Sequence, residues 1–250
     1  MHLPRLKIHY AWVIIGLSAL LYLGGGSITQ AFGVVILPLQ DEYGWSQGSI
    51  TLAYGISAIM SAALSPVIGM ATDRYGGRPV LFVGVACFFI GTAVSALATD
   101  VWHIWLSYGL FLGVTQACLN IALITTATYW FREKLGIGVG LLQCAQGVGP
   151  AGTTLLIGLL LPHYDWRVAF WSLGIGCGTA MTIIVFFFRS RPSDLGIEPL
   201  GGAWAGEVNQ RFTREIRMLR DKVRAASIQS TTAFWKLVMV HYLGCVSHAI

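Results

Sequence analysis

The chain has 250 residues, of which 55% are hydrophobic and only 11% are charged, and its mean hydropathy is +0.68. A soluble domain usually carries about a quarter charged residues. The formal net charge is +5, but a chain this apolar offers no soluble basic face, so we expect no nucleic-acid partner. The charges stand in short clusters between long apolar runs, which predicts membrane-spanning helices with the lipid bilayer as their surroundings.

Seven apolar segments follow one another along the chain. Each must be helical, because backbone amides in hydrocarbon need partners within their own segment. The runs are also far longer than the strands of a membrane barrel, which need only about 10 residues. The fold class predicted from them is an all-α integral membrane protein. The segments are expected at Ala11–Leu39, Ser49–Ala71, Pro79–Ala98, Val101–Phe131, Gly136–Leu161, Val168–Phe188 and Thr232–Ile250.

Lysine and arginine fall almost entirely on one side of these segments. The opposite loops hold Asp41, Glu42, Asp100 and Asp165 against the single Arg167. Because cytoplasmic loops collect basic residues, this bias predicts a multi-pass protein of the plasma (cell) membrane with a cytoplasmic N-terminus. The residues on the basic side are Arg5, Lys7, Arg74, Arg78, Arg132, Lys134, Arg189, Arg191, Arg211, Arg214, Arg217, Arg220, Lys222 and Arg224.

Two recurring tripeptides suggest an internal repeat. The tripeptide at Thr29 recurs at Thr115, three segments later, and the tripeptide at Gly91 recurs at Gly178. Segments three apart run in opposite directions, so these tripeptides predict a three-plus-three inverted repeat. Small residues such as Gly109 and Gly113 stand four apart, a spacing that lets helix backbones approach closely.

The sharpest motif is the stretch from Gly69 to Pro79. Gly76 and Gly77 permit a tight turn with positive φ, and Asp73 can bond helix-terminal amides and neighbouring arginines. The stretch resembles the loop signature of the major facilitator superfamily, although a usual Leu is Ala71 and one usual basic residue is Gly77. The resemblance implies a gating role for this loop; an ordinary positively charged loop is the alternative. The matching residues are Gly69, Asp73, Arg74, Gly76 and Arg78.

Other stretches narrow this resemblance. Tyr10–Trp12, Glu42–Ser46, Asp165–Arg167 and Arg189–Pro199 are similar to the bacterial monocarboxylate-porter and oxalate/formate-antiporter branch. That branch implies twelve helices in two six-helix halves, with the substrate bound between the halves near mid-membrane. The expected domains are then a six-helix bundle over 1–188, a cytoplasmic connection over 189–231, and the start of the second bundle over 232–250.

The last segment is short for a span. The uncharged stretch Leu237–Ile250 is too short to cross a bilayer, for which a helix needs about 20 residues. The chain therefore looks truncated in its seventh helix, and we expect a full carrier to require the missing C-terminal half. Within the connection, Val208, Phe212 and Ile216 recur at helical spacing among arginines. This predicts a basic amphipathic helix that either binds anionic lipid or packs beneath the bundle.

Polar side chains at mid-helix depth are candidates for a substrate pocket. Such groups are costly in hydrocarbon unless they face a partner or a cavity, and hydrogen bonding between helices is the alternative explanation. No Lys, Arg, Asp or Glu lies in the central part of the first six segments, so a carboxylate substrate would need its counter-cation from elsewhere. The candidates are Ser27, Thr29, Gln30, Gln116, Asn120, Gln143 and Gln146.

Two histidines are the titratable groups at depth. His241 and His248 lie in the seventh segment, where a proton-coupling role is possible on chemical grounds and simple hydrogen bonding is the alternative. We find no Ser/His/Asp grouping and no phosphate loop, and the five cysteines lack metal-ligand spacing. No catalytic residue, cofactor or metal site is therefore expected.

These observations favour a secondary transporter over an enzyme. The expected substrates are small organic anions such as monocarboxylates, carried by alternating access. A non-transporting membrane scaffold or sensor derived from a truncated transporter is the alternative.

Overall fold

The computed structural model describes residues 9–160, 163–202, 232, 236 and 239. The chain divides into two compact units, residues 1–203 and 204–250. All that follows concerns the first unit. The expected seventh helix, with His241 and His248, and the basic amphipathic helix of the connection lie outside the described residues.

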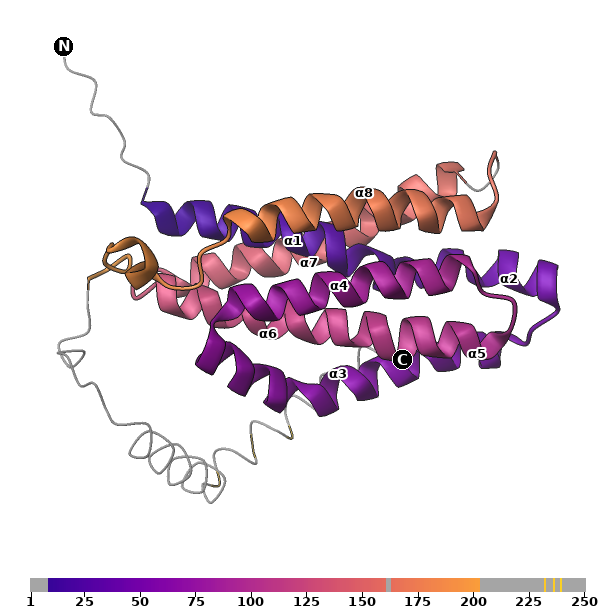
Figure 1. The fold of residues 1–250 in the computed structure, drawn as a ribbon, viewed down its shortest axis with the longest axis horizontal. Coiled ribbons are helices and arrows are strands. Elements are labelled where there is room, and N and C mark those ends of the chain that lie inside the picture. Colours follow the sequence, from indigo (N-terminus) through magenta and orange to yellow (C-terminus); the bar gives the residue numbers. More distant parts are fainter. Residues whose placement is uncertain (1–8, 161–162, 203–231, 233–235, 237–238, 240–250) are drawn as a thin grey trace, which may run out of the picture. The chain divides into compact units, whose positions relative to one another are not determined.

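The first unit is a bundle of helices that run back and forth between two ends (Figure 1). Among the residues that the structure describes, four spans are long and apolar enough to cross a membrane: Gln47–Tyr75, Gly77–Ala96, Val101–Trp130 and Trp166–Phe187. The helices are α1 (Tyr10–Gln30), α2 (Ile36–Tyr43), α3 (Gln47–Tyr75), α4 (Gly77–Ala96), α5 (Val101–Ile104), α6 (Gly113–Trp130), α7 (Leu135–Leu160) and α8 (Trp166–Phe187). The predicted fold class is confirmed, and α3, α4, α7 and α8 begin and end within a few residues of the predicted segments.

The first segment differs from the expected single helix over Ala11–Leu39. The helix α1 ends at Gln30, a 3-10 turn η1 covers Ala31–Val34, and α2 then continues to Tyr43. Pro38 explains where the second helix starts, because a proline ring collides with the carbonyl four residues earlier inside a continuous helix but is tolerated in a first turn. Gly44 ends α2 with φ +67, and its N–H donates to the carbonyl of Gln40 at 2.8 Å.

The fourth segment is also not a uniform α-helix. A π-helical stretch, η2 (Trp105–Leu112), joins α5 to α6. The glycines around it face α3: an added Cβ at Gly109 would lie 2.6 Å from Ile56 Cγ2, and one at Gly113 would lie 3.1 Å from the carbonyl oxygen of Ser57. The predicted role of these small residues in close helix packing is therefore confirmed.

The packing pattern has the symmetry of an inverted repeat. The helix α1 packs on α7, and its counterpart three spans later, α6, packs on α3. In the same way α1 packs on α8, and α6 packs on α4. When each of the first three spans is replaced by its counterpart three spans later, and the reverse, the same helix pairs are in contact. This is expected for two three-helix units of opposite orientation.

Candidate functional site

Asp73, the acidic residue of the loop motif, lies near the end of α3 beside α6. Its Oδ1 accepts a hydrogen bond from the Tyr129 hydroxyl at 2.8 Å. Arg191 donates instead to the backbone carbonyl of Asp73, at 2.6 Å, and its guanidinium lies 5.3 Å from the centre of the Tyr129 ring. The sequence predicted that the Asp73 carboxylate would bond helix-terminal amides and arginines. Among the described residues, it bonds neither an amide nor an arginine side chain. The phenol of Tyr129 takes their place, because α6 packs directly against α3.

The turn after Asp73 depends on its two glycines for different reasons. Gly76 has φ +89, as predicted, and its N–H donates to the carbonyl of Thr72 at 2.9 Å. Gly77 already begins α4 and has no positive φ. It is small for packing, since an added Cβ would lie 2.7 Å from Thr126 Oγ1.

Arg78 fastens the loop motif to the end of α8. Its backbone N–H donates to Ser190 Oγ at 2.8 Å, and its guanidinium donates to the carbonyl of Phe186 at 2.7 Å. The same guanidinium lies over the rings of Phe82 and Phe186, at 5.8 and 5.4 Å. Of the remaining motif residues, Arg74 is exposed, and its guanidinium lies over the Tyr75 ring. A Cβ added at Gly69 would lie 3.9 Å from Cγ2 of Ile121.

Residues 189–202, which we call the strap, bind across the same end of the bundle. Trp130 at the end of α6 donates from its indole nitrogen to the carbonyl of Arg189 at 3.1 Å. Leu200 donates to the Trp130 carbonyl at 2.9 Å and accepts from the amides of Arg132 and Glu133. The strap, the α3–α4 loop and the end of α6 form what we call the basic end.

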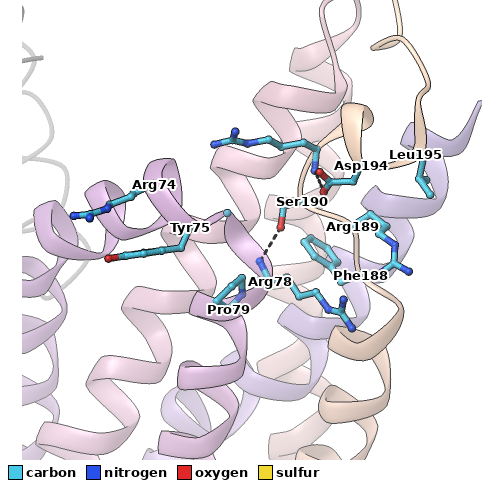
Figure 2. Close-up of a pocket in the computed structure, with 11 residues that line it drawn as sticks. Arg74, Tyr75, Arg78, Pro79, Phe188, Arg189, Ser190, Asp194 and Leu195 are labelled. Carbon is cyan, nitrogen blue, oxygen red and sulfur yellow. Dashed lines mark hydrogen bonds between the residues drawn. The ribbon is translucent and has the colours of Figure 1, made fainter. Parts of the chain in front are cut away.

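A cavity of about 520 Å³ opens at the basic end between the α3–α4 loop and the strap (Figure 2). Ser190 and Arg78 meet in its middle, with Arg74 on one side and Arg189 on the other. It is lined by Arg74, Tyr75, Gly76, Arg78, Pro79, Phe188, Arg189, Ser190, Arg191, Asp194 and Leu195.

The mid-depth polar residues come together only in part. Asn120 on α6 accepts a hydrogen bond from the side-chain nitrogen of Gln146 on α7, at 3.1 Å. Gln143, about one turn before Gln146, is exposed, and Gln116 is half-buried. The backbone of Ser27, Thr29 and Gln30 belongs to α1, but their side chains lie outside what the structure describes.

At the opposite end, two motifs far apart in the sequence meet. Glu42 on α2 accepts from the Trp166 indole at 2.6 Å and from Arg167 at 2.9 Å. Arg167 also pairs with Asp165 at 3.2 Å and donates to the hydroxyl of Tyr43. We call these five residues the acidic-end cluster. The hydrogen bonds from Arg167 and then Trp166 stabilise the ionised carboxylate and lower the pKa of Glu42.

Comparison with known proteins decides the family. The sequence profile of the Major Facilitator Superfamily matches residues 15–249. The chain belongs to this superfamily. Its curated relatives include monocarboxylate transporter 11 of Homo sapiens, 25% identical over 66% of this chain and 35% of that protein, and the uncharacterized MFS-type transporter YhcA of Bacillus subtilis, 28% identical over 70% and 33%.

Solved superfamily structures share the fold. The inward-open xylose transporter XylE from E. coli matches with a TM-score of 0.60 at 16% identity, over 74% of this chain and 49% of that one. The chain thus spans about a third of the length of these two curated relatives and about half of the solved transporter.

Two contacts of the loop motif could not be predicted from the sequence. Tyr129 and Ser190 bind the loop motif from 56 and 112 residues away. The stretch beginning at Arg189 stood out through its resemblance to superfamily members, but nothing in its composition indicates that it lies beside Arg78. Only the packing of α3, α4, α6 and α8 at one end brings these groups together.

Proposed function

We propose that this superfamily member is a secondary transporter of small organic anions, monocarboxylates among them, that works by alternating access. Membership of the superfamily supports transport, and relatives named as monocarboxylate transporters support the substrate class. The observation that carries the proposal is the amide pair of Asn120 and Gln146, with exposed Gln143 beside it.

The amide groups suit a carboxylate in a low-dielectric environment. Asn120 uses its oxygen to accept from Gln146, so its own NH₂ group is left to donate to a substrate oxygen. Gln143 presents a second amide about one turn away on the same helix as Gln146. Amides orient a carboxylate but do not neutralise it, and a buried charge needs a partner. A co-transported proton would serve, and His241 and His248 remain our proposals for its carrier.

We place the basic end at the cytoplasmic side of the plasma membrane. The arginines of the loop motif and of the strap gather there, whereas the other end carries Glu42 and Asp165. This distribution agrees with the positive-inside rule. In alternating access, the mid-depth amides would then be reached in turn from the acidic end and from the basic end.

Uptake measurements test the proposal. Proteoliposomes containing the complete transporter, with both six-helix halves, should take up labelled lactate, formate or oxalate with saturation. Asn120→Leu and Gln143→Leu should each reduce uptake at least about tenfold, as for the loss of a hydrogen bond to a charged group. Gln47→Leu, which removes an exposed amide at the start of α3, is the matched control and should leave uptake unchanged.

The outcomes separate the parts of the proposal. Unchanged uptake in both mid-depth variants would reject the site but keep the transporter. Uptake of other solutes and of none of these three acids would reject the substrate class. No uptake of any solute would favour the alternative, a membrane scaffold or sensor.

A further inference from the structure

Four of the residues that line the cavity at the basic end are arginines. Arg74 and Arg78 line it from the α3–α4 loop, and Arg189 and Arg191 line it from the strap. Asp194 is the carboxylate among its lining residues. Asp194 Oδ2 accepts from the backbone N–H of Arg191, at 3.1 Å, so part of its hydrogen-bonding capacity is already used.

None of these four arginines forms an ion pair with a carboxylate in the part of the chain that the structure describes. Both ion pairs found there involve Arg167, at the opposite end. Within the same part of the chain, the Nε–H groups of Arg78 and Arg191 are buried and have no hydrogen-bond partner. A buried donor without a partner is costly, and four like charges around one cavity repel one another. An anion in the cavity relieves the second of these costs; the two Nε–H groups are closed to solvent, so an anion in the cavity does not reach them.

The chemistry of the lining selects a phosphate. Guanidinium groups bind phosphate oxygens through paired N–H donors, and Ser190 adds a hydroxyl at the centre of the cavity. We propose that this cavity is a binding site for a phosphate group, presented either by the headgroup of an anionic lipid or by a soluble phosphate. Neither the transported substrate nor the mid-depth amides take part in it.

The surroundings of the cavity are compatible with a lipid source. Phe82, Phe186 and Phe187 are exposed near the ends of α4 and α8 that approach the cavity, and Tyr75 is exposed on its rim. Aromatic side chains are enriched where hydrocarbon meets the headgroups. Basic pockets between spanning helices at the cytoplasmic face are known to suit anionic headgroups.

Binding to three defined probes tests the site in the purified chain, held in a neutral detergent. The probes are dioctanoyl phosphatidic acid, inorganic phosphate and, as a zwitterionic control, dioctanoyl phosphatidylcholine. Phosphatidic acid and inorganic phosphate should bind and compete with each other, and phosphatidylcholine should not bind. A phosphatidic acid Kd at least about tenfold below that of inorganic phosphate assigns the lipid as the source, and equal values assign soluble phosphate.

Matched variants show whether the arginines are responsible. Arg189→Gln keeps the hydrogen bond from Trp130, which uses the backbone carbonyl, and Arg74 is exposed, so both variants should fold. Arg189→Gln and Arg74→Gln should each weaken binding of both anions about tenfold. Lys134→Gln removes an exposed cation that does not line the cavity and should change binding less than twofold. Absence of binding to either anion, or equal weakening by Lys134→Gln, would overturn the proposal.

Discussion

The two ends of the bundle treat arginine in opposite ways. At the acidic end, Arg167 contacts two carboxylates, Glu42 and Asp165, and a phenol, so its charge is neutralised within a few ångströms. At the basic end, four arginines line one cavity and form no carboxylate pair among the described residues. The charge of Arg167 is balanced within the acidic-end cluster, and the hydrogen bonds of this cluster connect α2 to α8. At the basic end, the phosphate group that we propose would supply the negative charge.

The backbone conformations of the glycine turns at the two ends also differ. Gly44 at the acidic end has φ +67 and ψ 17, a left-handed conformation that other residues can adopt at modest cost. Gly76 at the basic end has φ +89 and ψ 164, a region that is nearly restricted to glycine. The basic end is therefore the more constrained of the two, although its side chains are the less neutralised.

The largest expected difference between the two ends is their accessibility to a reagent that cannot cross the membrane. In a variant whose five cysteines are replaced by Ala, Asp41→Cys and His163→Cys should react with an impermeant maleimide in intact cells. Lys134→Cys should react only after permeabilisation, because we propose, on the positive-inside rule, that the basic end faces the cytoplasm. Labelling is read from the mass shift of the purified protein. The reverse pattern would contradict the orientation and exchange the roles that we assign to the two ends.

The glycine turns should differ in their sensitivity to a side chain. Gly76→Ala should lower the free energy of unfolding by about 2 kcal/mol, because of its backbone conformation. The added Cβ would also lie 3.2 Å from Ser190 Oγ. Gly44→Ala meets open space and should cost roughly 1 kcal/mol. Denaturant titrations measure both. Gly48→Ala, at a helical glycine with open space around it, controls for the extra methyl group, and equal losses at positions 44 and 76 would contradict the comparison.

Asp73 tests whether the basic end takes part in the transport cycle. Asp73→Asn should lower the maximal uptake rate about tenfold while changing KM less than twofold, because a gating residue shifts the balance between conformations rather than substrate contacts. Tyr129→Phe removes the hydrogen bond to Asp73 but keeps the charge, and we expect a loss of about threefold. Uptake kinetics in proteoliposomes that contain the complete transporter, with both halves, distinguish these cases. If Asp73→Asn transports at the parent rate, the loop has no part in the mechanism.

The acidic-end cluster should produce the smallest effect, visible as a dependence on pH. The folded-state pKa of Glu42 is lowered, so its contribution to stability is complete above the ordinary Glu pKa of about 4.3. That contribution is lost as the pH falls through the lower, folded-state value. The side chains of Arg167 and Glu42 are 31% and 39% exposed, and solvent screening should keep the effect below about 1 kcal/mol. Comparing Tm from pH 7 to pH 3 for the parent and Glu42→Gln should show a shallower decline in the variant, and parallel curves would argue against the ion pair.

Among the described residues, the sequence alone determined where the spans lie, apart from the break in the first segment, and which loops share an end. Both follow from one-dimensional physics: an apolar run must match the thickness of the hydrocarbon layer, and basic residues accumulate on one side of it. The loop motif around Asp73 and the positive φ at Gly76 were also predictable, because the first is a local pattern and the second depends on a residue without a Cβ.

Tertiary structure decided the partners of these residues. The acidic-end cluster joins Glu42 to Arg167 across 125 residues, and Ser190 meets Arg78 across 112. The break of the first segment at Ala31–Val34 and the π-helical stretch at Trp105–Leu112 were likewise decided by tertiary structure. Helix periodicity gives the direction of a side chain around its own axis, but not which neighbouring helix stands there. For that reason the sequence could nominate Asn120 and Gln146 separately, and only the packing of α6 against α7 made them a pair.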